Sequence, residues 1–220
     1  MTVSPPVRTY QGAAIIPQDR WMLRIQAVFG CVAFAAISVT ATIAGGLAAV
    51  AGVAYGATLA LSSVASFIYN SRFRHRRGET VADRWRLLDH SAIFLLIAGT
   101  YTPFGLLVLS DGPKQLITVW SLALTGVLLK FVVRFRFQAA FLLLYLATGW
   151  SVAIGMDRAL AEIEPTSMAL LIAGGIAYTT GVLFHLRTSW RWYSAIWHAF
   201  VLVASILHFG AVWTTIGARV

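Results

Sequence analysis

Residues 88–104 read LDHSAIFLLIAGTYTPF, an apolar stretch that opens with the ionisable side chains of Asp89 and His90. It overlaps a longer apolar run at residues 90–110, and a helix needs roughly 20 such residues to cross the hydrocarbon core of a bilayer. Ionisable groups are costly inside a membrane, so those that occur there are candidates for function. The stretch therefore predicts a transmembrane helix with a polar end.

The composition of the whole chain agrees with a membrane location. Of its 220 residues, 59% are hydrophobic and 11% are charged, with a mean hydropathy of +0.76, whereas about a quarter of a soluble domain is charged. A formal net charge of +9 would suggest nucleic-acid binding in a soluble protein. Here the basic residues fall between apolar runs, so we expect no nucleic-acid partner. The single cysteine, Cys31, provides neither a disulfide within the chain nor a cysteine-based metal site.

Seven apolar runs are long enough to cross a bilayer. They lie near residues 25–44, 47–70, 90–110, 115–133, 138–156, 167–186 and 194–216. The predicted fold is an all-α membrane protein, a seven-transmembrane helix bundle at residues 25–216. A cytoplasmic N-terminal arm, residues 1–24, is expected before the bundle and a C-terminal tail, residues 217–220, after it. The lipid bilayer is the first expected partner.

Positive charge is distributed unequally over the two sides that seven spans define. All but three of the 17 Lys and Arg residues fall on the side of the N-terminus, and the exceptions are Lys114, Arg158 and Arg219. Because basic loops stay in the cytoplasm, we predict an N-terminus inside and a C-terminus outside. The densest basic segment, Arg72–Arg86, either marks this topology or also binds anionic lipid.

Polar side chains gather at the cytoplasmic ends of these runs. Ser66 and Asn70 are four residues apart, as are Ser194 and His198, and this spacing places each pair on one face of its helix. With Asp89 they are expected to line one polar cavity. The alternative for Asp89 is a favourable placement of its carboxylate at a helix N-terminus.

His208 is expected to lie apart from this group. It follows His198 by ten residues, about 15 Å of helix at 1.5 Å per residue. We therefore expect an interhelical hydrogen bond rather than a place in the cavity.

The stretch at residues 88–104 is similar to the signature of the hemolysin III family, bacterial relatives of the progestin and adiponectin (PAQR) receptors. The resemblance continues through WHAFVLVAS at residues 197–205 and LHF at 207–209. It implies a seven-helix bundle with the N-terminus inside, in a bacterial inner membrane, and agrees with the orientation drawn from the basic residues.

The resemblance also implies a zinc site at the cytoplasmic end of the bundle, built from a Ser-x-x-x-His and a His-x-x-x-His pattern. Here the two patterns read Ser66 to Asn70 and Ser194 to His198. Amide and hydroxyl oxygens are not usual zinc ligands, which leaves His198 and Asp89 as the candidate metal ligands. We therefore predict a degenerate zinc site and a polar cavity without metal.

Three functions are compatible with this sequence. The first is a non-enzymatic membrane protein of the hemolysin III type that acts in membrane homeostasis or cytolysis. The second is a zinc-dependent lipid amide hydrolase, as in ceramidase-like enzymes, and the replacement of two zinc ligands argues against it. The third is a sensor for a lipid-like ligand. The oligomeric state is left open by the sequence.

Overall fold

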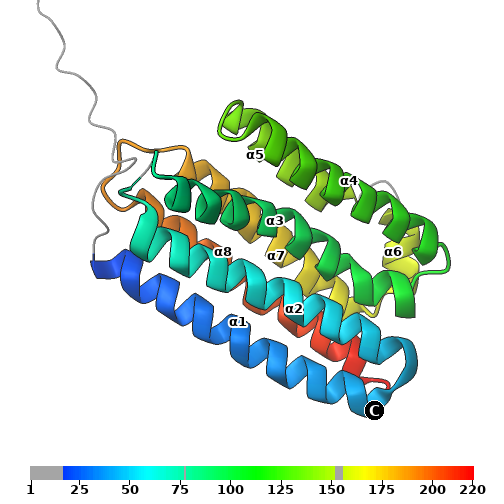
Figure 1. Cartoon of the computed structure of the whole chain (residues 1–220). Coiled ribbons are helices and arrows are strands. Elements are labelled where there is room, and N and C mark those ends of the chain that lie inside the picture. Colours follow the sequence, from blue (N-terminus) through cyan, green and yellow to red (C-terminus); the bar gives the residue numbers. More distant parts are fainter. Residues whose placement is uncertain (1–16, 77, 152–155) are drawn as a thin grey trace, which may run out of the picture.

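The computed structural model describes residues 17–76, 78–151 and 156–220, and every regular element within these ranges is a helix (Figure 1). This confirms the all-α prediction. The elements are α1 (Pro17–Ala44), α2 (Gly46–Ile68), the π-helical turn η1 (Tyr69–Phe73), α3 (Thr80–Leu107), α4 (Gly112–Val133), α5 (Gln138–Gly149), α6 (Met156–Glu162), α7 (Pro165–His185) and α8 (Tyr193–Gly217).

Six of these helices, α1 to α4, α7 and α8, are each long and apolar enough to cross a membrane. The predicted run 138–156 instead contains α5, a helix of 12 residues. At its end the Tyr101 hydroxyl donates to the carbonyl oxygen of Gly149 at 3.2 Å, and the Ser151 hydroxyl donates to the carbonyl of Thr148 at 2.7 Å. These contacts take up backbone groups that a continuing helix would use, so the α-helix stops at Gly149.

Helix α5 runs back along α4 (Figure 1). The start of α5 is next to the end of α4, where Lys130 Nζ lies 3.5 Å from Gln138 Oε1. Helix α6 is next to the turn between α3 and α4, where Arg158 pairs with Asp111 at 2.5 Å and Glu162 accepts a hydrogen bond from the Ser110 hydroxyl at 2.6 Å. The short α6 is thus held at the opposite end of the bundle from the start of α5.

Helix α1 begins at Pro17, eight residues before the predicted run at 25–44. Proline suits the first position of a helix, and the acidic Asp19 in the first turn is favoured by the helix dipole. Residues 17–24 of the expected N-terminal arm are therefore helical. The rest of that arm, residues 1–16, lies outside the described residues.

Small residues bring the first two helices close together. A Cβ atom at Gly52 would lie 2.3 Å from the Cβ of Ala41, and one at Gly56 would lie 2.7 Å from the Phe34 ring. Close approach buries Ile37 and Tyr55 in the apolar core. Elsewhere the helices present apolar side chains outward, including Val28, Val32, Val39, Leu128 and Val132, as expected of a bundle that faces lipid.

We expect acidic pH to loosen α6 from the rest of the bundle. Hydrogen bonds from the Ser110 hydroxyl and backbone N–H hold the pKa of Glu162 below its usual value. A carboxylate with a lowered pKa in the folded state stabilises it fully above the unfolded pKa, about 4.3 for Glu, and this contribution is lost as pH falls through the folded pKa. The protection factors of α6 amides in hydrogen exchange, which correct for the intrinsic pH dependence of the exchange rate, should fall over that window. In Ser110→Ala the fall should be smaller, and a fall as large as in the unmodified protein would contradict the assignment.

Candidate functional site

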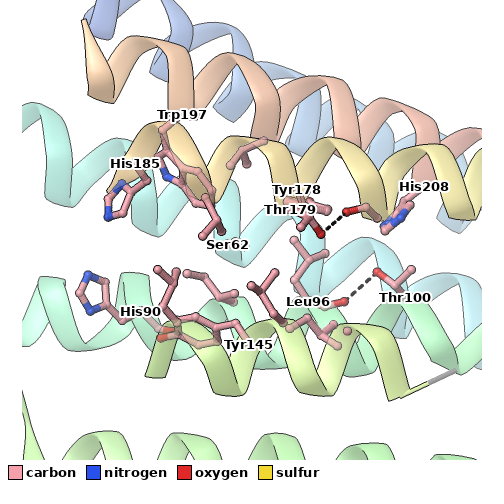
Figure 2. A pocket seen from close by; sticks show the side chains of 18 of the residues that line it. Ser62, His90, Leu96, Thr100, Tyr145, Tyr178, Thr179, His185, Trp197 and His208 are labelled. Atoms are coloured by element: carbon pink, nitrogen blue, oxygen red, sulfur yellow. Dashed lines mark hydrogen bonds between the residues drawn. The ribbon is translucent and has the colours of Figure 1, made fainter. Parts of the chain in front are cut away.

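A cavity of about 600 Å³ lies inside the bundle, lined by residues from α2, α3, α5, α7 and α8. In Figure 2, Tyr178, Thr179 and His185 of α7 face Leu96 of α3 and Tyr145 of α5 across this space. The five residues expected to share a polar cavity all line it, and they are Ser66, Asn70, Asp89, Ser194 and His198.

The five polar residues mark one end of the cavity, which we call its polar end. The end of α2 and the start of α3 form one side of this polar end. The Asn70 amide nitrogen donates to the carbonyl oxygen of Ser66 at 3.0 Å and to its hydroxyl at 3.3 Å. Both side chains are also hydrogen-bond partners of the Asp89 carboxylate. Asn70 lies in η1, and π-helical turns often occur at functional sites because they redirect side chains.

Arg74 is the residue that sequence reasoning missed. Its side chain is buried, and Nη1 donates to the Ser194 hydroxyl at 2.7 Å. The same nitrogen lies 3.5 Å from Asp19 Oδ2, while Nη2 donates to the Tyr193 hydroxyl. One guanidinium therefore joins the start of α1, the end of η1 and the start of α8. A signal was present in the sequence, because Ser66, Asn70 and Arg74 follow one another at intervals of four.

The three histidines of α7 and α8 lie at two depths in the cavity. His198 and His185 both line the polar end, and in each the buried Nδ1 atom has no hydrogen-bond partner among the described residues. His185 packs against Trp197, with ring centroids 5.1 Å apart. His208 lies deeper, and its Nε2 atom is 3.2 Å from the carbonyl oxygen of Leu171 on α7. The interhelical hydrogen bond expected for His208 is thus present, although its ring also lines the cavity.

Comparison with known proteins decides the family. Residues 22–209 match the family model described as "Haemolysin-III related". The chain belongs to the haemolysin III family. It is 37% identical to the Hemolysin-3 homolog of Bacillus subtilis, over 72% of this chain and 73% of that protein. It is 38% identical to Hemolysin-3 of Bacillus cereus, over 75% of this chain and 74% of that protein. It is 27% identical to the human Monocyte to macrophage differentiation factor, over 72% of this chain and 67% of that protein.

The polar end of this haemolysin III chain does not fit the zinc ion that the family resemblance implies. Ser194, at one expected ligand position, accepts a hydrogen bond from the Arg74 guanidinium, and this fixed cation would repel a metal dication. Asn70, at another, directs its amide N–H groups to Ser66. Within the described residues, no group of three or more His, Cys, Asp or Glu is placed to hold a metal, while structural and catalytic zinc sites use at least three protein ligands.

Proposed function

We propose that this chain is a multi-pass protein of the bacterial inner membrane that holds a lipid-like molecule in its cavity and acts in membrane homeostasis without zinc chemistry. The observation that carries the proposal is the cavity itself. A volume of about 600 Å³ lies within the range of roughly 300–1,000 Å³ typical of small-molecule sites. One end is polar, and the remainder is lined by apolar side chains that include Phe104, Leu109, Met168, Leu171 and Ile172.

The membrane topology that we propose has seven crossings, with α5 and α6 together forming an interrupted fifth. Irregular backbone is tolerated at membrane depth where it is buried in protein or lines a cavity, and Gly149 and Trp150 line this cavity. With seven crossings the two ends of the chain lie on opposite sides, in keeping with the positions of the start of α1 and of the C-terminus (Figure 1).

A reporter protein fused after Val220 tests this topology. Since Lys114, Arg158 and Arg219 alone lie on the side opposite the other basic residues, we expect the C-terminus outside. Alkaline phosphatase fused there should be active, and a cytoplasm-dependent fluorescent protein should be dark. The reverse pattern would contradict either the seven crossings or their orientation.

The structure offers less support for the second candidate, a zinc-dependent lipid amide hydrolase. Such an enzyme needs a metal-bound water of lowered pKa and a metal to polarise the scissile carbonyl. Here the Arg74 guanidinium contacts the residue at an expected ligand position. The word hemolysin in the names of the Bacillus relatives describes those proteins, and a cytolytic role for this chain is a proposal that rests on the family alone.

A lipid-binding measurement tests the proposed function. We expect the purified protein to retain lipid in native mass spectrometry and to leave a ceramide-type amide intact with or without added zinc. Ile172→Trp, which adds bulk to the cavity lining, should reduce lipid retention severalfold. The matched control is Ile176→Trp, one turn further along α7 at a residue that is 55% exposed, and it should retain lipid as the unmodified protein does. Equal retention in both variants, or zinc-dependent hydrolysis, would contradict the proposal.

A further inference from the structure

His208 brings an imidazole ring to the wall of the cavity, far from the polar end. It follows His198 by ten residues of α8, about 15 Å at 1.5 Å per residue. In Figure 2, His208 and Thr100 lie at the other end of the pocket from His185 and His90. His208 is therefore a polar side chain in the part of the cavity where apolar lining predominates.

A glycine on α7 makes room for this ring. A Cβ atom at Gly174 would lie 2.2 Å from His208 Cδ2 and 2.4 Å from Nε2. The ring therefore packs directly on the backbone of α7, where Nε2 is 3.2 Å from the carbonyl oxygen of Leu171. One turn further along α7, the Tyr178 ring lies 5.5 Å from the imidazole, measured between centroids. These contacts fix the position of the imidazole.

The contact with Leu171 decides which ring nitrogen carries the hydrogen. A carbonyl oxygen can only accept, so Nε2 is the donor. A charged imidazole is costly within a membrane span, and in the neutral ring the second nitrogen, Nδ1, is then an acceptor.

This acceptor is open to the cavity. Among the residues that the structure describes, none gives a hydrogen bond to Nδ1 of His208. The Nδ1 atoms of His185 and His198 also lack a partner, but they are enclosed by protein, whereas that of His208 is not. Because His208 lines the cavity, a molecule held there can reach its Nδ1 atom.

Other polar side chains along the apolar part of the cavity already use their donors within the protein. The Trp150 indole donates to the Thr179 hydroxyl at 3.0 Å. Thr179 and Thr100 each donate to a backbone carbonyl oxygen one turn earlier, at 2.8 Å. The hydrogen-bond donor that His208 lacks is therefore left for the ligand to supply.

We propose that His208 accepts a hydrogen bond from a hydroxyl group on the apolar part of the lipid-like ligand, as in a fatty acid hydroxylated near the middle of its chain. Such a hydroxyl lies about 15 Å from a head group at the polar end. A plain acyl chain has no polar group there and a ketone has only an acceptor, so both leave Nδ1 unpaired. A site built to bind a hydroxyl discriminates against such analogues. The inference rests on the proposed lipid-binding function and names the ligand class.

The test compares three fatty acids that share a head group and a chain length: stearic acid, 12-hydroxystearic acid and 12-oxostearic acid. Equilibrium binding to the full-length protein in detergent should be roughly five- to tenfold tighter for 12-hydroxystearic acid than for stearic acid, the effect of one neutral hydrogen bond. The ketone should bind no more tightly than stearic acid, because its oxygen cannot donate to Nδ1.

Two variants remove the acceptor in different ways. His208→Phe keeps a planar ring without nitrogen, and Gly174→Ala places a Cβ where the imidazole now lies and so displaces it. Both should lose the preference for 12-hydroxystearic acid and bind stearic acid as the unmodified protein does. The matched control is Gly210→Ala on α8, where the nearest atom to a new Cβ is Leu170 Cδ1 at 3.3 Å. This control should keep the preference.

Each contrary outcome identifies what is wrong. Equal binding of stearic and 12-hydroxystearic acid by the unmodified protein would overturn the hydroxyl site and leave the lipid cavity intact. A preference that persists in both His208→Phe and Gly174→Ala would overturn the assignment to His208. Binding of 12-oxostearic acid as tight as that of 12-hydroxystearic acid would show a donor rather than an acceptor at the site. Binding of none of the three would overturn the proposed function together with the site.

Discussion

Replacing Arg74 by alanine is expected to destabilise the bundle by about 3–5 kcal/mol, the usual cost of breaking a buried ion pair by removing one partner. The side chains of Arg74 and Asp19 are only 7% and 5% exposed, so the substitution leaves an uncompensated carboxylate inside the protein. It also removes the donors to Ser194 and Tyr193. Reversible unfolding in mixed detergent micelles measures the change in the free energy of unfolding.

The matched control is Arg76→Ala, two residues further along the chain. Arg76 pairs with Glu79 at 3.9 Å, and both side chains are more than half exposed. Exposed ion pairs contribute about 0–1 kcal/mol, so this variant should unfold almost as the unmodified protein does. If the two variants lost equal stability, the Arg74 network would not be the link between α1 and α8 that the structure indicates.

The second large effect is a gain of zinc binding. The family pattern predicts that Asn70→His and Ser194→His create a three-histidine site with His198, and tetrahedral zinc accepts three imidazoles and a water. Because Arg74 contacts Ser194, we expect Arg74→Gln in the same background to tighten binding further, to nearly one zinc per chain. Metal analysis and calorimetric titration measure the uptake. Zinc uptake should weaken as pH falls through the histidine pKa range, about 6.5, since each ligand must lose its proton.

The control for this gain is the variant with Asn70→Gln, Ser194→Ala and Arg74→Gln. It removes the same native side chains and supplies no imidazole, so it should remain without zinc. A folded double variant with Asn70→His and Ser194→His that fails to take up zinc would show that Asn70 and Ser194 do not occupy the ligand positions.

Local sequence pattern predicted much of this fold. Six apolar runs became long helices because about 20 apolar residues both suit a bilayer and favour a helix there. The run at 138–156 contains only the shorter helix α5 because of a tertiary contact. The Tyr101 hydroxyl, from α3, donates a hydrogen bond to the carbonyl oxygen of Gly149, where α5 ends. No pattern within the run itself contains that information.

Sequence spacing likewise indicated some residues of the candidate site and missed others. The i, i+4 spacing predicts one helix face for Ser66 and Asn70 and another for Ser194 and His198, and all four residues line the cavity. The role of Arg74 was not visible, because in sequence it reads as one of the basic residues that mark the cytoplasmic side. Its buried ion pair depends on a partner far along the chain, Asp19.

The central claim, that an arginine network rather than a metal organises the polar end of the cavity, is tested most directly by the zinc content of the unmodified protein. The protein should be produced in zinc-supplemented medium and purified without chelator before elemental analysis. We predict well under one zinc per chain. One zinc per chain, lost on substitution of His198 or Asp89, would contradict the account and identify these residues as metal ligands.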